Sequence, residues 1–254
     1  MSTRTDHTLS LGGTDRRDAW WIYPAFVAVT LTIFGIYATW AAAQGVHYHW
    51  QSYLSPFYSP TIKPAWLPEW LSPAFLILGA PLGFRATCYY YRKAYYRGYF
   101  LSPPACAVGK GKSTGYTGER AFPFILQNLH RFFLYLAIII LFVLWYDVIL
   151  AFIWDGRFGM GLGTVILFAN AALLTGYTLG CHSLRHLIGG KMDCFSCHTL
   201  GKQAHSAWQG VTWLNQRHEQ FAWSSLFAVG IADLYVRLGS MGFISPSFDL
   251  WFTL

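Results

Sequence analysis

The sequence predicts an all-α integral membrane protein with five transmembrane helices. Of its 254 residues, 54% are hydrophobic and only 11% are charged, and several uncharged stretches are long enough to cross a bilayer. A water-soluble domain carries roughly 25% charged residues, so the composition excludes that class. The 12 Trp, 16 Tyr and 20 Phe residues are typical of a lipid–water boundary. The net charge of +7 reflects scarce acids, 11 against 18 bases, and does not indicate a nucleic-acid partner.

Five stretches are predicted to cross the membrane. The first, residues 19–44, has no charge and exceeds the roughly 20 residues that the hydrocarbon core requires. The second, residues 72–91, is interrupted by Gly79 and Pro81, which indicates a kinked helix. The remaining predicted spans are 131–154, 160–186 and 221–240.

The distribution of Lys and Arg predicts the orientation of the chain. Fourteen of the 18 bases lie in the N-terminal tail, between spans two and three, or between spans four and five, when Arg131 and Arg185 at the adjoining span ends are included. Positively charged loops stay in the cytoplasm, so the N-terminus is expected to be cytoplasmic. Residues 1–18 are then a cytoplasmic tail without signal-peptide features. Residues 19–254 form a single transmembrane domain, whose inner segment 180–205 is expected to bind metal.

Histidine and cysteine residues concentrate at the inner end of the fourth span and in the loop that follows it. His182 and His186 are four residues apart, which places both imidazoles on one face of a helix. Cys194 and Cys197 have the C-x-x-C spacing that lets two thiolates bind one metal. These four side chains are therefore predicted to form a His₂Cys₂ metal centre. The alternative ligands are Cys181 and His198.

Four identities are open for this centre. The run Cys194-Phe-Ser-Cys197-His198 matches the attachment pattern of c-type haem, although the predicted orientation places it in the cytoplasm. A structural zinc ion accepts the same ligand types. A b-type haem could be held by His130 with one of the two histidines of the fourth span. A Rieske-type [2Fe-2S] cluster, with two Cys on one iron and two His on the other, would use all four side chains.

These motifs resemble the membrane-anchor subunit of succinate dehydrogenase, respiratory complex II. More narrowly, the sequence is similar to the five-helix anchor of the haem-less class, in which a membrane-embedded Rieske-type cluster stands where other members hold haem b. The resemblance rests on the span layout and on Cys181-His182, His186 and Cys194-Phe-Ser-Cys197-His198. Familiar Rieske loops read C-x-H and C-x-x-H, so the ligand set stays open.

The resemblance implies a multi-pass subunit of the bacterial cell (inner) membrane. It implies that flavoprotein and iron–sulfur subunits dock on the cytoplasmic face and that electrons pass to quinone in the membrane. The flavin and the succinate site would then belong to those partners. This subunit would carry the site of quinone reduction. It would hold the redox centre in position and set the redox potential of that centre.

Polar residues in the predicted spans are candidates for the quinone site. Arg85 is costly in a membrane unless it snorkels or has a partner, and it is the candidate hydrogen-bond donor to reduced quinone. Tyr89 belongs to a tyrosine-rich stretch at the membrane boundary and could line the same site. Asp233 is expected to pair with Arg237, four residues on. For Asp147, a proton relay and a cross-helix pair with Arg237 are both open.

Two other function classes compete with this interpretation. One is a b-type cytochrome anchor of a related quinone oxidoreductase, which a haem absorption band would identify. The other is a non-redox membrane protein, such as a transporter, with a zinc-stapled loop. The sequence lacks the repeated halves that mark many transporters. Metal analysis separates the classes. Iron with acid-labile sulfide indicates the iron–sulfur cluster, and zinc indicates a structural zinc site in the loop.

Overall fold

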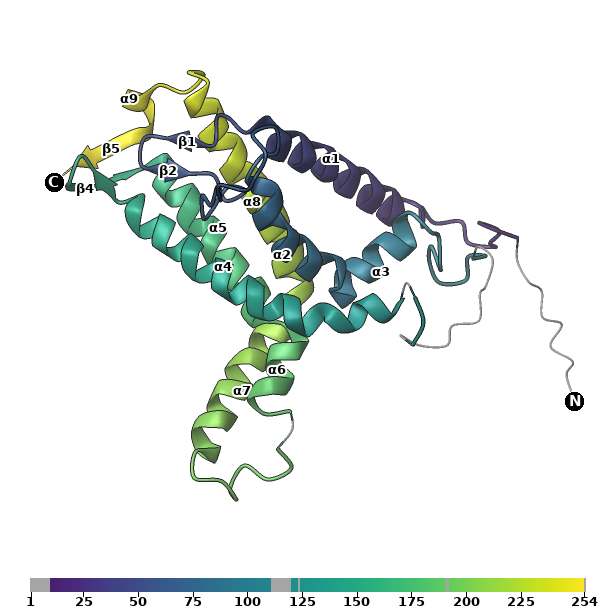
Figure 1. The fold of residues 1–254 in the computed structure, drawn as a ribbon. Helices are drawn as coiled ribbons and strands as arrows, with labels where there is room; N and C mark the ends of the chain where they lie inside the picture. Colours follow the sequence, from purple (N-terminus) through teal and green to yellow (C-terminus); the bar gives the residue numbers. More distant parts are fainter. Residues whose placement is uncertain (1–9, 111–119, 123, 191, 254) are drawn as a thin grey trace, which may run out of the picture. The chain divides into compact units, whose positions relative to one another are not determined.

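The computed structural model describes residues 10–110, 120–122, 124–190 and 192–253, and these are mostly helical (Figure 1). The chain divides into two compact units. The first unit contains Met1–Tyr37 and Ala86–Asn128, and the second contains Ala38–Arg85 and Leu129–Leu254. Each unit is described by itself.

The first unit contains most of helix α1 (Ile22–Gln44), helix α3 (Tyr89–Gly98) and the 3₁₀ helix η1 (Phe124–Leu129). The hydroxyl of Tyr99, just after α3, donates to the α1 carbonyl of Ala28 at 3.0 Å. This hydrogen bond links the two helices through uncharged groups.

Three long helices of the second unit pack side by side: α4 (His130–Leu150), α5 (Leu162–Leu179) and α8 (His218–Ser240). Helix α5 packs against both of the others. In the described part of the chain, four helical stretches are long and apolar enough to cross a membrane, namely Ile22–Gln44, Phe124–Leu150, Leu162–Leu179 and His218–Ser240. The first, third, fourth and fifth predicted spans are thus confirmed as long apolar helices.

The second predicted span is not one continuous helix. Helix α2 (Ala74–Ala86) has 13 residues, and at 1.5 Å per residue it is about 20 Å long, shorter than the roughly 30 Å hydrocarbon core. The chain leaves the helical conformation at Cys88 before α3 begins, whereas Pro81 lies inside α2. A fifth crossing is therefore not shown, and the break comes later than the kink expected near Pro81.

The fourth predicted span also ends early. Helix α5 stops at Leu179, and Cys181 starts a separate short helix, α6 (His182–Ile188), by accepting a bond from the Ser183 backbone N–H at 3.3 Å. A loop then leads to α7 (Gly201–Gln216). Helices α6 and α7 pack on each other as a hairpin, which extends away from α4 and α5 in Figure 1.

Five short strands, which the sequence analysis did not predict, close the opposite end of the second unit. Strands β1 (His49–Trp50) and β2 (Tyr53–Leu54) form an antiparallel pair. The remaining elements are β3 (Ile153–Trp154), β4 (Arg157–Gly161), α9 (Pro246–Asp249) and β5 (Leu250–Thr253). Strand β4 is the centre of an antiparallel sheet with β3 on one side and β5 on the other.

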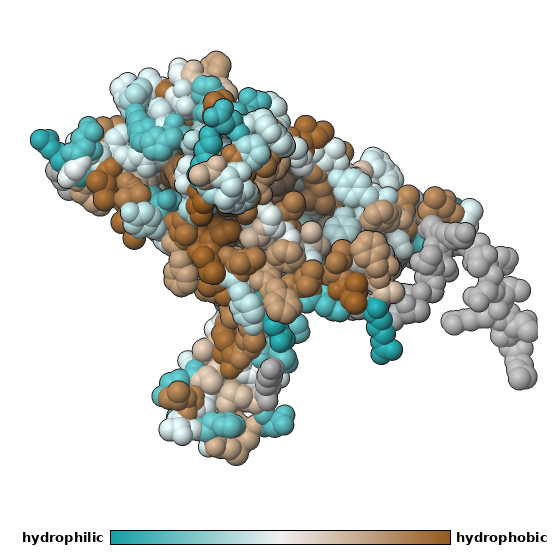
Figure 2. Space-filling view, viewed as in Figure 1, coloured by the Kyte–Doolittle hydropathy of each residue, from teal (hydrophilic) through white to brown (hydrophobic). Residues whose placement is uncertain are grey.

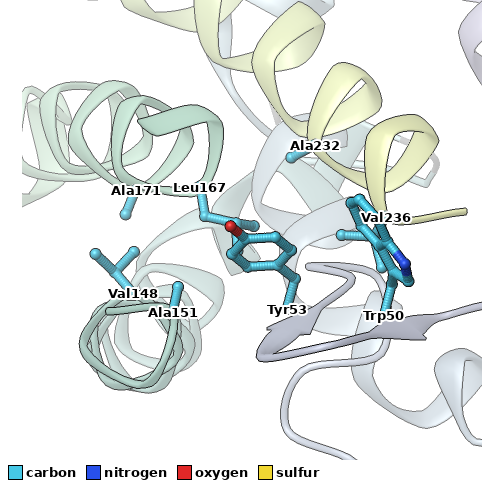
Figure 3. Close-up of a cluster of buried hydrophobic side chains, with 8 residues drawn as sticks. All are labelled: Trp50, Tyr53, Val148, Ala151, Leu167, Ala171, Ala232 and Val236. Atoms are coloured by element: carbon cyan, nitrogen blue, oxygen red, sulfur yellow. The ribbon is translucent and has the colours of Figure 1, made fainter. Parts of the chain in front are cut away.

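The core of the second unit lies beneath these strands. Trp50 and Tyr53 extend from the β1–β2 pair between α8 and the helices α4 and α5 (Figure 3). Trp50 lies beside Val236 of α8, and Ala151 and Leu167 contribute from α4 and α5. These two aromatic side chains anchor the strand pair to the helical bundle.

The outward faces of the long helices are apolar. On α4, Leu134, Leu141 and Val148 are buried at seven-residue spacing, whereas Ile139 and Phe142 are exposed by 59% and 72%. Apolar atoms cover much of the visible surface over α4 in Figure 2. Because such a face is unfavourable in water, it fits contact with lipid.

Candidate functional site

A group of stacked rings lies where α4 begins and α5 ends. We call it the histidine stack, and its members are Phe84, Arg85, His130, Tyr177, Cys181 and His218. Phe84 of α2 stacks on the His130 ring at 4.7 Å and meets Tyr177 edge-on at 5.2 Å. Tyr177 then stacks on His218, the first residue of α8, at 4.9 Å. Four elements therefore contribute rings to one continuous stack.

Arg85, in the last turn of α2, is the charged member of this stack. Its guanidinium carbon is 4.7 Å from the centre of the Tyr177 ring, which is a cation–π contact. Two of its nitrogens donate to α8, one to the Ala222 carbonyl at 3.1 Å and one to the Ser225 hydroxyl at 3.0 Å. The positive charge is thus held in place by a ring and two neutral acceptors.

Close helix packing brings these side chains together. A Cβ at Gly83 would lie 2.3 Å from the Phe133 ring of α4, and one at Gly176 would lie 2.5 Å from Phe221 of α8. A larger residue at either position would require the facing phenylalanine ring or the helix to move. The two glycines therefore allow these helices to approach closely beside the stack.

The stack combines chemistry suited to a redox ligand. The imidazole nitrogens are hydrogen-bonding groups, and a guanidinium favours negative charge that develops on a bound oxygen. His218 and Tyr177 are 3% and 1% exposed, so these groups act in a largely water-excluded environment.

The four predicted metal ligands do not come together. His182 and His186 both lie in α6 as expected, but His186 Nδ1 is 3.1 Å from an Arg131 guanidinium nitrogen. Cys194 and Cys197 are joined by a disulfide, which removes the thiolates that iron or zinc requires. Among the described residues, no three His, Cys, Asp or Glu side chains lie close enough to hold a metal ion. The expected His₂Cys₂ set does not fit this arrangement.

The alternative ligands fare no better as a complete set. Cys181 Sγ is 3.2 Å from His130 Nε2, so one substitute ligand meets the histidine considered for haem b. Two donors fall short of the four that a Rieske-type cluster or a structural zinc ion takes. His198 lies exposed beside Cys197, and with both loop cysteines oxidised, c-type haem attachment lacks its free thiols as well.

The two predicted quinone residues fall in different units. Arg85 occupies the end of α2 described above, whereas Tyr89 begins α3 and is 61% exposed. The Tyr89 ring contacts Tyr90 at 5.5 Å and lies 5.5 Å from the Arg92 guanidinium carbon. Its surroundings fit the membrane-boundary role of that tyrosine-rich stretch.

The acids in the spans are paired within the bundle. Asp233 pairs with Arg237 at 3.3 Å, as expected from their spacing, and both are buried. Ser55 also donates to Asp233. Asp147 accepts a hydrogen bond from Ser59, and not from Arg237, which is bound to Asp233 and to the α1 carbonyl of Ala41. The guess of a cross-helix pair between Asp147 and Arg237 is therefore wrong.

A second buried polar group, at the strand-capped end, had no signal in the sequence. The fully buried Asp249 carboxylate accepts bonds from Tyr53 at 2.7 Å, Tyr235 at 2.6 Å and the Gly163 N–H at 2.7 Å. Burial raises the pKa of the Tyr53 hydroxyl well above its ordinary value, so Tyr53 stays a donor. This group, the Asp249 clasp, ties α9 to the N-terminus of α5.

The sequence analysis also missed Phe84, Tyr177 and His218 as site residues. The sequence could have indicated the α8 part of the site. His218, Ala222 and Ser225 follow helical spacing and therefore lie on one face of that helix. Arg85 binds the last two, but only the folded structure brings α2 to that face.

Comparison with known proteins gives two matches. Residues 22–242 match the family described as actinobacterial succinate dehydrogenase subunit SdhC. A chain in the solved structure of the Mycobacterium smegmatis Sdh1 complex in the apo form is 44% identical, with a TM-score of 0.83 over 94% of each chain. No curated protein matches the sequence.

Proposed function

We propose that this chain, which belongs to the actinobacterial succinate dehydrogenase SdhC family, passes electrons from a docked iron–sulfur subunit to quinone in the membrane. Family membership makes it a multi-pass membrane subunit of bacterial succinate dehydrogenase, part of a complex with the other subunits. Its own contribution, in this proposal, is the site of quinone reduction.

The position of Arg85 in the histidine stack carries the proposal. Quinone reduction adds two electrons and two protons, and negative charge develops on the carbonyl oxygens before the protons arrive. A guanidinium fixed by Tyr177 and Ser225 is already oriented when that charge appears. The imidazoles of His130 and His218 belong to the same stack, and their ring nitrogens are hydrogen-bonding groups for a bound quinone.

The membrane arrangement we propose has a cytoplasmic N-terminus and five crossings. Helix α2 with the break at Cys88 would form the fifth, shorter crossing, with non-helical backbone buried in protein as membranes require. The histidine stack then lies toward the cytoplasm, where flavoprotein and iron–sulfur subunits would dock. Tyr89, which begins α3, stays a predicted quinone-site residue.

A Rieske-type cluster remains a prediction from the resemblance. Because its expected ligands do not converge and two of them form a disulfide, we derive no step of quinone reduction through it. The same argument applies to zinc, which would use the same four ligands, and haem b likewise stays a prediction through which we derive no step. Iron, acid-labile sulfide and zinc analysis of the purified complex would decide among them.

Arg85→Met tests the quinone site directly. We expect succinate:quinone turnover to fall about 100-fold, the loss usual for one oriented donor to developing negative charge. Arg85→Lys, which keeps the charge but not the forked geometry, should retain more activity than Arg85→Met. Both are measured in complexes purified from membranes with all subunits present.

The control separates quinone reduction from assembly. Succinate oxidation with a water-soluble dye as electron acceptor bypasses the membrane quinone and should be the same in both Arg85 variants. If quinone turnover in Arg85→Met were unchanged, the quinone site would lie elsewhere. Equal loss of dye and quinone activity would show instead that Arg85 holds the complex together.

A further inference from the structure

We propose that Cys194 and Cys197 form a thiol–disulfide exchange site in the loop between α6 and α7, in place of the metal-ligand role expected from their spacing. The two residues are disulfide-bonded, with their Cα atoms 5.5 Å apart, which is ordinary for such a bond. The loop belongs to the hairpin that extends from α4 and α5 (Figure 1). This proposal does not depend on the site of quinone reduction.

The bond is accessible to reagents. Cys197 is exposed and Cys194 is half-buried. By contrast, the sulfur atoms of Cys88 and Cys181 lie in buried side chains. Exchange requires a thiolate to approach a sulfur in line with the bond, so exposure favours it. The C-x-x-C spacing is also the one used by redox-active pairs.

The bond is dispensable for the fold of the hairpin. It closes a ring containing only Phe195 and Ser196 between the cysteines, and a disulfide restrains the unfolded chain less as its loop shortens. Stabilisation of the fold is therefore a weak reason for this bond.

Contacts that do not involve sulfur hold the loop on α7. The Phe195 ring lies 5.0 Å from His205 and 6.2 Å from Trp208, and the Arg185 guanidinium carbon is 4.5 Å from the centre of the Trp208 ring. The Phe195 carbonyl approaches Gly201 so closely that a Cβ there would lie 1.5 Å from it. The loop can therefore open and close its disulfide while the hairpin stays folded.

The exchange balances with an external dithiol as reductant. One thiolate of the dithiol attacks a sulfur of the pair, breaks the Cys194–Cys197 bond and forms a mixed disulfide. The second thiol of the reagent then displaces the protein. The reagent is oxidised to its disulfide by two electrons, and its two hydrogens end on Cys194 and Cys197.

Counting maleimide-reactive thiols on this subunit in the purified complex tests the proposal. The background variant is Cys106→Ser, which removes the exposed free thiol. In the folded complex we expect no tag on the subunit before dithiothreitol and two afterwards, located at Cys194 and Cys197 by peptide mass analysis. Adding Cys194→Ser is the matched control, because Cys197 should then take one tag without reductant.

Three outcomes would overturn the proposal. Two tags without dithiothreitol would show free or metal-bound thiols. Tags that appear only after the complex is unfolded would show a closed structural disulfide. Loss of iron or acid-labile sulfide from the complex carrying Cys194→Ser and Cys197→Ser would return the pair to the role of cluster ligands. Unchanged iron in that variant, together with tagging after reduction, supports exchange.

Discussion

The two ends of the second unit bury titratable groups in opposite ways. In the Asp249 clasp, one carboxylate receives three donors, two from tyrosine hydroxyls and one from backbone. In the histidine stack, His130, Tyr177 and His218 are positioned by ring faces. The carboxylate of the clasp is satisfied by hydrogen bonds, whereas the members of the stack are positioned through their ring faces. We therefore assign the Asp249 clasp to the stability of the fold and the histidine stack to the chemistry of the site.

Asp233→Ala should give the largest effect. It removes the partner of Arg237 and leaves a buried guanidinium without a counter-ion. We expect the free energy of unfolding to fall by about 3–5 kcal/mol, as for other broken buried pairs. The midpoint of thermal denaturation of the purified complex measures it, with the exposed Asp15→Ala as control. Full stability with lost quinone turnover would contradict a structural role for this pair.

Asp249→Asn tests the clasp more gently. The amide keeps the shape of the carboxylate but loses the charge that strengthens the bonds from Tyr53 and Tyr235. A hydrogen bond to a charged group contributes about 1.5–3 kcal/mol, so we expect a loss of about 2 kcal/mol in stability. Quinone turnover per folded complex should stay unchanged. A turnover defect at full stability would make the clasp part of the functional machinery.

His218→Phe probes the other end of the comparison. Phenylalanine can keep the stacking on Tyr177 but removes the imidazole nitrogens. We expect succinate:quinone turnover to fall roughly tenfold, equivalent to about 1.4 kcal/mol, with little change in the denaturation midpoint. Dye-linked succinate oxidation is the control. A variant that loses stability and keeps turnover would show that the two ends do not differ as argued.

Tyr235→Phe should have the smallest effect. It removes one of the three donors to Asp249 and leaves Tyr53 and the Gly163 N–H in place. Loss of a single hydrogen bond of this kind corresponds to about 1 kcal/mol of stability. A small downward shift of the denaturation midpoint, at unchanged turnover, is the expected measurement. No shift at all would mean that the remaining donors satisfy the carboxylate fully.

Much of the helical layout could be predicted, because a long uncharged stretch has few alternatives in a membrane. Helices α1, α4 and α8 lie where hydropathy places them. The break at Cys88 and the end of α5 at Leu179 were missed, because uncharged residues continue past both, to Tyr91 and to Leu184. Hydropathy reports what lipid tolerates and does not report where the backbone turns.

The candidate site divides in the same way. The sequence alone singled out Arg85, since a guanidinium in an apolar span demands a partner, and the Asp233–Arg237 pair, since four residues bring two side chains to one helix face. It also marked the Cys and His residues after the fourth span, but their spacing is compatible with both a metal and a disulfide. The spacing of residues along the chain limits which side chains can meet. It does not decide whether two cysteines bind a metal or each other.

By itself, the sequence determined that this protein is a membrane-spanning helical subunit and which residues carry its charge. Only the tertiary structure decided that Arg85 meets Tyr177 and Ser225, that Tyr53 and Tyr235 share Asp249, and that Cys194 and Cys197 bind each other. The physical reason is the range of the forces involved. Transfer into lipid depends on the composition of each segment alone, whereas ring stacking and hydrogen bonds depend on ångström-scale distances that helix packing sets.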